Sequence, residues 1–334
     1  MVKIFNETLT QQLDIIWEPA SDGARILRVY GEHPVLVLPD YIEGLPVTEI
    51  GPYCFSRSEP KLPKHPFHYH INQKETGSTP LSCLSGSVVE AILLPSSITT
   101  LHNAAFYNCR NLHTLSVGTQ IHSIGSDEFM NCTQLSKLIM RGTDTEANGL
   151  ALLLERFAEN LLVLFQSSDS LTAALFFPEY YEWLDEISPA HIFSRSIHGE
   201  GFRMRKCFEG DKVNYEKYDQ CMENALKVES KETLCLISIT RLRWPNGLLS
   251  DARIAYEQIL HENMSIAIDM AIKEKDLDQL VFLCSYWSDS DYTQAITACI
   301  NADWGEGSAR LMEEKHQNGS FADKQFSFDD FEDF

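Results

Sequence analysis

Residues 94 to 138 contain the same pattern twice. LPSSITTLHNAAFYNCRNLHTL runs from Leu94 to Leu115, and VGTQIHSIGSDEFMNCTQLSKL runs from Val117 to Leu138. A step of 23 residues places equivalent residues on one another without a gap. The matched pairs include Ile98 with Ile121, Leu101 with Ile124, Phe106 with Phe129, Asn108 with Asn131, Cys109 with Cys132, and Leu112 with Leu135. A fixed period in the twenties is typical of leucine-rich-repeat solenoids, which present a surface for binding.

The first copy has the pattern LPxxIxxLxxxAFxxCxxLxxL. This pattern resembles the BspA-like leucine-rich repeat, which is common in bacterial surface and host-associated proteins. The second copy departs from it at Val117 and Gly118, which replace Leu-Pro, and at Glu128, which replaces alanine. The resemblance covers roughly residues 24–142 and implies a bacterial protein with a leucine-rich-repeat β-solenoid. It implies no particular activity, because one fold serves many functions.

A partial earlier copy and an insertion precede these two repeats. The partial copy consists of Leu38, Pro39, Val47, Ile50, Gly51, Cys54 and Phe55. Phe55 and Phe106 are 51 residues apart, which is two periods plus five, so we expect an insertion loop at 56–82. This segment contains His65, His68 and His70, and imidazoles at such spacing can bind zinc or nickel. Because no fourth ligand is evident nearby, we predict no metal site.

The segments that flank the repeats differ from them in pattern. Residues 13–38 contain β-forming residues broken by turn residues, which predicts a β-hairpin that caps the N-terminal end of the solenoid. From residue 143 a helical spacing follows, with apolar residues at Leu150, Leu153, Leu154, Phe157 and Leu161. Residues 162–165 and 174–178 fit short strands and helix ends equally well.

Two helix–turn–helix copies follow each other at a step of 28 residues, in which Ala267 matches Ala295 and Leu283 matches Leu311. They resemble the paired helices of ankyrin-like or other α-solenoid arrays. The expected fold class is therefore α+β. The expected divisions are a leucine-rich-repeat domain at 1–142, a mainly helical, solenoid-like domain at 143–318, and an acidic, phenylalanine-rich tail at 319–334. The tail either packs on the chain's own helices or docks on a partner.

Alternation along the repeat strands predicts a binding face. Leu115 and Val117 point inward, so Thr114 and Ser116 point outward. Together with their equivalents in the neighbouring repeats they form the predicted ribbon, which consists of Ala91, Leu93, Thr114, Ser116, Lys137 and Ile139. Apolar residues on an outward face favour a protein-binding site. The alternative is that the helical domain folds back over this face.

Composition narrows the class of partner. The chain has 334 residues, 44% of them hydrophobic, and a formal net charge of −21. Such a charge disfavours nucleic acid and anionic membrane surfaces, and it favours protein partners with a basic surface. No run of 18 apolar residues and no signal peptide is visible. Nine cysteines without a CxxC pair predict reduced thiols and a cytoplasmic protein.

The segment 178–245 offers a different class of site. His198, Gly199, Gly201, Arg203 and Arg205 combine a glycine loop with basic side chains, which can hold a small anion. Sequence patterns of known catalytic sites are absent, so we expect no catalytic residues and no cofactor. The predicted function is a non-catalytic protein-interaction adaptor. The alternatives are an enzyme or small-anion-binding protein with a site near 198–205, and a surface adhesin; the oligomeric state is not predicted.

Overall fold

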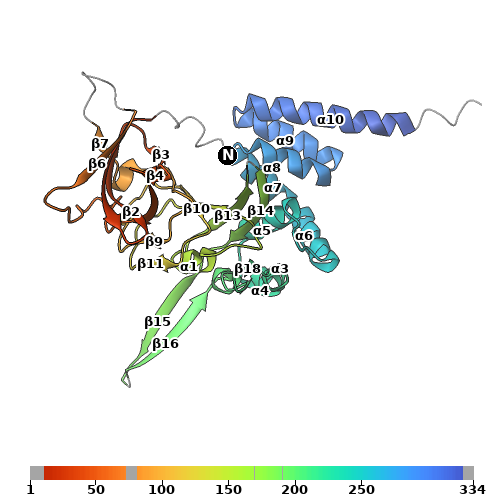
Figure 1. Cartoon of the computed structure of the whole chain (residues 1–334). Coiled ribbons are helices and arrows are strands. Elements are labelled where there is room, and N and C mark those ends of the chain that lie inside the picture. The colour runs from red at the N-terminus through yellow and green to blue at the C-terminus, as the bar shows by residue number, and fades with distance from the viewer. Residues whose placement is uncertain (1–10, 73–80, 169, 190, 326–334) are drawn as a thin grey trace, which may run out of the picture. The chain divides into compact units, whose positions relative to one another are not determined.

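The computed structural model describes residues 11–72, 81–168, 170–189 and 191–325. The chain divides into two compact units, Met1–Val228 and Glu229–Phe334. The strands belong to the first unit, and the helices from α5 onward belong to the second (Figure 1). This division differs from the boundary expected at 142, for a reason that lies in the last coil of the solenoid.

The repeats form a parallel ladder of strands, one from each coil. The strands are β3 (Val35–Val37), β8 (Ala91–Leu93), β10 (Thr114–Gly118), β12 (Lys137–Arg141) and β13 (Leu161–Ser167). Leu115 of β10 lies opposite Leu138 of β12, which is the 23-residue step expected from the sequence. Strand β14 (Ser170–Phe177) then pairs antiparallel with β13. The expected β-solenoid is therefore confirmed.

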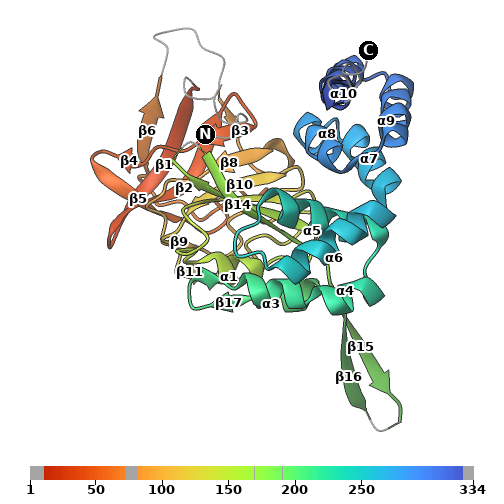
Figure 2. The same cartoon turned by 90° about the vertical axis from the view of Figure 1, so that its right-hand side faces the viewer.

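A second sheet contains the other short strands of the coils. Strands β5 (Leu45–Ile50), β9 (Thr100–Leu101) and β11 (Ser123–Ile124) are parallel, and β4 (Tyr41–Ile42) pairs with β5. The sheet continues through the antiparallel hairpin of β1 (Leu13–Ala20) and β2 (Gly23–Gly31), because β2 pairs with β5. This hairpin is the expected N-terminal cap (Figure 2).

Arg28 of β2 supplies donors at the N-terminal end of the repeats. Its guanidinium, in a side chain only 5% exposed, donates to the carbonyl oxygens of Tyr53, Cys54 and Ser56 at 3.0, 3.2 and 2.8 Å. In the next coil, the carbonyl of Ala105 accepts a hydrogen bond from the amide of Phe55. Buried carbonyl groups need such partners, and the arginine provides them where the stack begins.

A column of phenylalanine rings fills the core. Phe55 stacks on Phe106 with centroids 5.3 Å apart, and Phe106 stacks on Phe129 at 5.2 Å. Phe157 closes the column at 4.7 Å from Phe129, with its ring tilted by 41°. The burial expected for the repeat positions is confirmed, since Phe106, Phe129, Leu112 and Leu135 are all buried.

The repeated cysteines bond from coil to coil. The thiol of Cys109 donates to the carbonyl oxygen of Phe55 at 3.2 Å, and that of Cys132 donates to Phe106 at 3.1 Å. Both side chains are buried. A small residue with a weak donor therefore fits this position of the motif. All nine cysteines are free thiols.

The last coil extends the solenoid beyond the expected boundary. Helix α1 covers only Leu150–Leu154, and the chain then turns into β13, whose Val163 lies opposite Leu138. The apolar residues at 150–161 with helical spacing do not form one helix, since they fill the coil's interior and begin the next strand. Residues 162–165 and 174–177, which the sequence left open, are strands.

The insertion at 56–82 contributes strands of its own. Strand β6 (Phe67–Ile71) pairs antiparallel with β1, and β7 (Ser82–Cys83) pairs with β2. A 3-10 turn, η2 (Gly86–Val88), leads back into the repeats. Because the ends of the insertion lie on successive coils, Phe55 and Phe106 remain stacked despite the 51 residues between them.

The rest of the first unit follows the solenoid. It comprises the hairpin β15 (Tyr181–Ile187) and β16 (Ile192–His198), helix α2 (Gly201–Met204), the ribbon β17 (Phe208–Glu209) and β18 (Lys212–Val213), and helices α3 (Tyr215–Gln220) and α4 (Met222–Val228).

The second unit consists of paired helices. Its elements are α5 (Lys231–Arg243), α6 (Ser250–Glu262), α7 (Met264–Lys273), α8 (Leu277–Leu283), the 3-10 turn η3 (Cys284–Tyr286), α9 (Asp289–Asn301) and α10 (Gly305–Gln325). The 28-residue step maps α7 and α8 onto α9 and α10. Ala267 and its equivalent Ala295 are both buried. The expected helical C-terminal region is therefore confirmed.

Candidate interaction surface

The structure brings the six residues of the predicted ribbon together. Ala91, Thr114 and Lys137 are aligned across β8, β10 and β12, and so are Leu93, Ser116 and Ile139. Only Lys137 is half-buried, and the other five side chains are buried, Ile139 completely. Alternation along the strands gives the ribbon's geometry correctly. The ribbon is, however, covered in the structure, so it does not form an open binding face.

A surface that the ribbon prediction missed lies on the hairpin β15–β16. The two strands form a sheet of their own. In both views they extend away from the rest of the first unit (Figures 1 and 2). Five large side chains are between 39% and 68% exposed: Tyr181, Trp183, Leu184, Phe193 and Ile197. An isolated two-stranded hairpin is marginally stable, and exposed apolar clusters usually mark interaction sites.

Cross-strand register divides these side chains between two faces. Trp183 lies opposite Ser196, and the ring of Tyr181 stacks on His198 with centroids 4.8 Å apart. On the other face, Leu184 lies opposite Arg195. Residues two apart on a strand share a face, so this second face also carries Phe193 and Ile197. The hairpin is therefore apolar on both faces.

Acidic groups lie among the apolar side chains of the hairpin. Glu182 forms an ion pair with Arg195, and Glu186 contacts the ring of His191. Asp185 accepts a hydrogen bond from the indole nitrogen of Trp183 at 2.5 Å. The signal in the sequence is the period-two pattern of YEWLDEI and IFSRSIH on either side of a short turn. It fits a strand that is wet on both faces as well as it fits a partly buried one.

The anion site expected near 198–205 has a structural explanation. Arg205, only 3% exposed, donates to the carbonyl oxygens of Pro178, Gly201 and Glu159 at 2.5, 3.0 and 2.6 Å. Its guanidinium lies 5.2 Å from the centroid of the Tyr180 ring. Burial lowers its pKa to about 10. This arginine closes a loop onto the solenoid, and its donors point at protein carbonyls.

The other basic groups of this segment also have local partners. Arg203 lies 3.5 Å from a carboxylate oxygen of Glu200, and Lys206 lies 2.8 Å from Glu155. A pocket of about 230 Å³ beside them is lined by two carboxylates as well as by Arg205 and Lys206. Gly201 serves close packing, since a Cβ there would lie 1.9 Å from the Pro178 carbonyl oxygen. The arrangement favours a structural role for the glycine loop.

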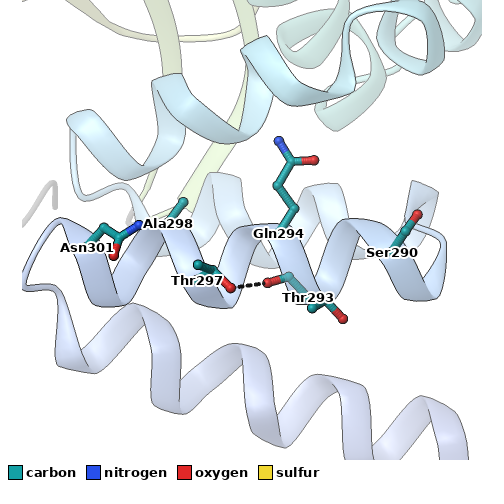
Figure 3. A pocket seen from close by; sticks show the side chains of 6 residues that line it. All are labelled: Ser290, Thr293, Gln294, Thr297, Ala298 and Asn301. Carbon is teal, nitrogen blue, oxygen red and sulfur yellow. Dashed lines mark hydrogen bonds between the residues drawn. The ribbon is translucent and has the colours of Figure 1, made fainter.

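A wider hollow lies along helix α9 and measures about 630 Å³. Figure 3 shows its lining, six side chains from that helix alone: Ser290, Thr293, Gln294, Thr297, Ala298 and Asn301. The hydroxyl of Thr297 donates to the Thr293 carbonyl at 2.8 Å. Small polar groups on one helix do not converge on a common point, so no ligand chemistry is defined here.

The insertion places two of its three histidines beside a carboxylate. His68 and His70 lie near Asp14, whereas His65 precedes β6 and lies outside this cluster. Helix α10 carries the expected tail as far as Gln325. The phenylalanines from Phe326 onward lie outside the described residues. Among the described helices, none combines the length and apolarity that crossing a membrane requires.

The stacked coils, with one strand from each coil in a parallel ladder, define a leucine-rich-repeat protein. Residues 44–151 match the family model described as BspA type Leucine rich repeat region (6 copies). The repeats are therefore of the BspA type, as the motif of residues 94–115 implied. No curated protein and no solved structure matches the chain.

Proposed function

We propose that this chain is a non-catalytic adaptor that binds a protein partner through the hairpin β15–β16. Leucine-rich-repeat domains commonly mediate protein binding. The observation that carries the proposal is the exposure of Trp183, Leu184 and Phe193 on a hairpin with its own two-stranded sheet. Large aromatic and apolar side chains in water are the usual anchors of interfaces. The solenoid then serves as the rigid body that presents the hairpin.

The charge of the chain defines the partner. The hairpin carries Glu182, Asp185 and Glu186 beside its apolar residues, within a chain of net charge −21. A partner with an apolar patch rimmed by lysines and arginines complements this surface. Nucleic acid and anionic lipid are disfavoured, because both repel an acidic protein. The nine free thiols support a cytoplasmic location.

Local pairing of the basic groups supports an adaptor over the alternative of an anion-binding site. Arg205 is bound to three carbonyl oxygens, and Arg195 and Lys206 pair with carboxylates. Such cations are already neutralised or sterically committed, so they have little to offer a small anion. The same observation removes the main support for an enzyme with a site near 198–205.

The test uses the full-length chain and the variant Trp183→Ser/Phe193→Ser. We expect this variant to keep the wild-type unfolding midpoint, because both side chains are more than half exposed. Binding to the partner, identified by affinity purification and measured with the purified protein, should weaken at least about tenfold. Met130→Ser is the matched control, since Met130 is 52% exposed on a turn of the solenoid.

Three outcomes would contradict the proposal. The first is equal binding by the hairpin variant and the wild type. The second is a partner that lacks a basic rim, with binding that does not weaken as salt rises. The third is a wild-type dimer that the hairpin variant converts to a monomer, since the hairpin would then bind a second copy of this chain.

A further inference from the structure

Two histidines and an aspartate converge on one face of the N-terminal sheet. Strand β6 pairs antiparallel with β1, and His70 lies directly opposite Asp14. His68 is two residues away on the same strand, so it shares the face of His70. The three residues therefore come from two adjacent strands whose backbone pairing fixes their spacing.

The ligand atoms of these side chains lie close together. Nδ1 of His68 lies 3.0 and 3.2 Å from the two carboxylate oxygens of Asp14. Nδ1 of His70 lies 3.3 Å from one of them. One ligand atom from each residue fits in a group whose members all lie within 4.8 Å of one another. Two imidazoles and one carboxylate therefore point at a common region.

We propose that Asp14, His68 and His70 form a three-ligand site for a divalent transition-metal ion, with Zn²⁺ as the reference ion. Zinc binds imidazole nitrogen at about 2.0 to 2.1 Å, so two ligands of a tetrahedral ion lie about 3.3 Å apart. The observed separations between nitrogen and oxygen atoms are close to this value. Little movement of the side chains is needed to admit the ion.

The donor set defines the class of ion. Imidazole suits zinc, cobalt, nickel and copper, whereas calcium and magnesium prefer sites made only of oxygen ligands. Both histidines are 43% exposed, which leaves room for water or an external ligand in the remaining coordination position. The large negative charge of the chain also attracts cations.

The site has a structural consequence for the insertion. Strand β6 is the edge strand of its sheet and joins the solenoid only through β1. An ion bound by Asp14 on one strand and by two histidines on the other would clip this edge in place. Metal binding then stabilises the folded state by mass action.

The test is a Zn²⁺ titration of the full-length chain, prepared without a histidine tag and with its thiols reduced. We expect Asp14→Asn and His68→Ala each to weaken binding at least about tenfold. His65→Ala is the matched control, because it removes an imidazole from the same segment but outside the cluster, and it should bind as the wild type does. Zn²⁺ should raise the melting temperature of the wild type and of His65→Ala, but not of His68→Ala.

Substitution of Co²⁺ separates this site from a cysteine site. Ligation by nitrogen and oxygen gives weak visible bands without a thiolate charge-transfer band. A thiolate band, binding that Asp14→Asn and His68→Ala leave unchanged, or an equal loss in His65→Ala would overturn the proposal. Circular dichroism confirms that each variant is folded before titration, and His70→Gln replaces any variant that is not.

Discussion

Glu128 is an acidic residue in the core of a repeat. It occupies the position of Ala105 in the preceding coil, and its side chain is 1% exposed. Neither carboxylate oxygen has a hydrogen-bond partner apart from the residue's own backbone. Burial raises the pKa of this carboxyl to about 7. The group is therefore neutral in the folded protein over a range in which it is ionised in the unfolded chain.

This shift predicts a pH-dependent effect. The folded pKa of about 7 exceeds the unfolded value of about 4.3. The folded state therefore holds the extra proton between these values, and stability falls as pH rises through this window. Glu128→Gln should be nearly neutral at pH 4 and should increase the free energy of unfolding by about 2 to 3 kcal/mol at pH 8. Urea denaturation at both pH values measures this.

The control for Glu128 is its exposed neighbour. Asp127→Asn removes one carboxylate at a position where the backbone has φ 59, a conformation that asparagine tolerates. It should change stability by less than about 0.5 kcal/mol at either pH. Equal effects of Glu128→Gln at pH 4 and pH 8 would show that the carboxyl is not held neutral.

Phe129 lies in the middle of the phenylalanine column, in contact with Phe106 and Phe157. Phe129→Ala removes a buried ring from between two others, so the free energy of unfolding should fall by about 3 to 5 kcal/mol. The exposed Met130 gives the control, since Met130→Ala should cost less than about 0.5 kcal/mol. Similar losses for the two variants in urea denaturation would argue against the column as the core of the solenoid.

At the scale of elements, the predicted ribbon is a test of what covers the ladder. Ile139 on β12 is completely buried although it points away from the interior of the coils. Ile139→Glu should therefore lower the free energy of unfolding by more than about 3 kcal/mol, because it buries an unpaired charge. Lys137→Gln on the same strand should change it by less than about 1 kcal/mol. Wild-type stability of Ile139→Glu, measured by thermal melting, would return the ribbon to the list of open surfaces.

Local pattern predicted the elements that repeat and missed those that do not. The step from Leu115 to Leu138 fixed the strand register, because each coil buries the same positions. The last coil escaped prediction, since α1 and the longer path to Phe157 replace the motif. Its apolar residues fit a helix as well as they fit a coil, and only stacking against Phe129 decides between them.

The candidate sites depended on contacts between distant segments. Alternation gave the faces of β10 and β12, but no local pattern reports what covers a face. The pairing of β6 with β1 brings Asp14 to the histidines across more than fifty residues of sequence. The sequence showed the histidines without this carboxylate. Likewise, Arg205 was visible as a cation, but its three carbonyl partners lie on other loops.

At the scale of the whole molecule, net charge should affect stability. The chain carries −21, and most of its ion pairs are exposed and individually weak. Repulsion therefore outweighs attraction, and added salt should screen it. Raising sodium chloride from about 10 mM to about 150 mM should increase the melting temperature by about 2 to 4 °C, which corresponds to roughly 1 kcal/mol. A fall in melting temperature would mean that the ion pairs dominate.

The most direct test of the account is to find which surface the partner touches. A photo-reactive phenylalanine analogue placed at Phe193 should cross-link to the partner in living cells, because this side chain is 68% exposed on the hairpin. The same analogue at Met130, which is 52% exposed on the solenoid, should not. Adducts that form at Phe193 alone, and that disappear when Trp183→Ser is added, are the predicted result. Adducts at Met130 but not at Phe193 would contradict the central claim that the solenoid presents the hairpin as its binding surface.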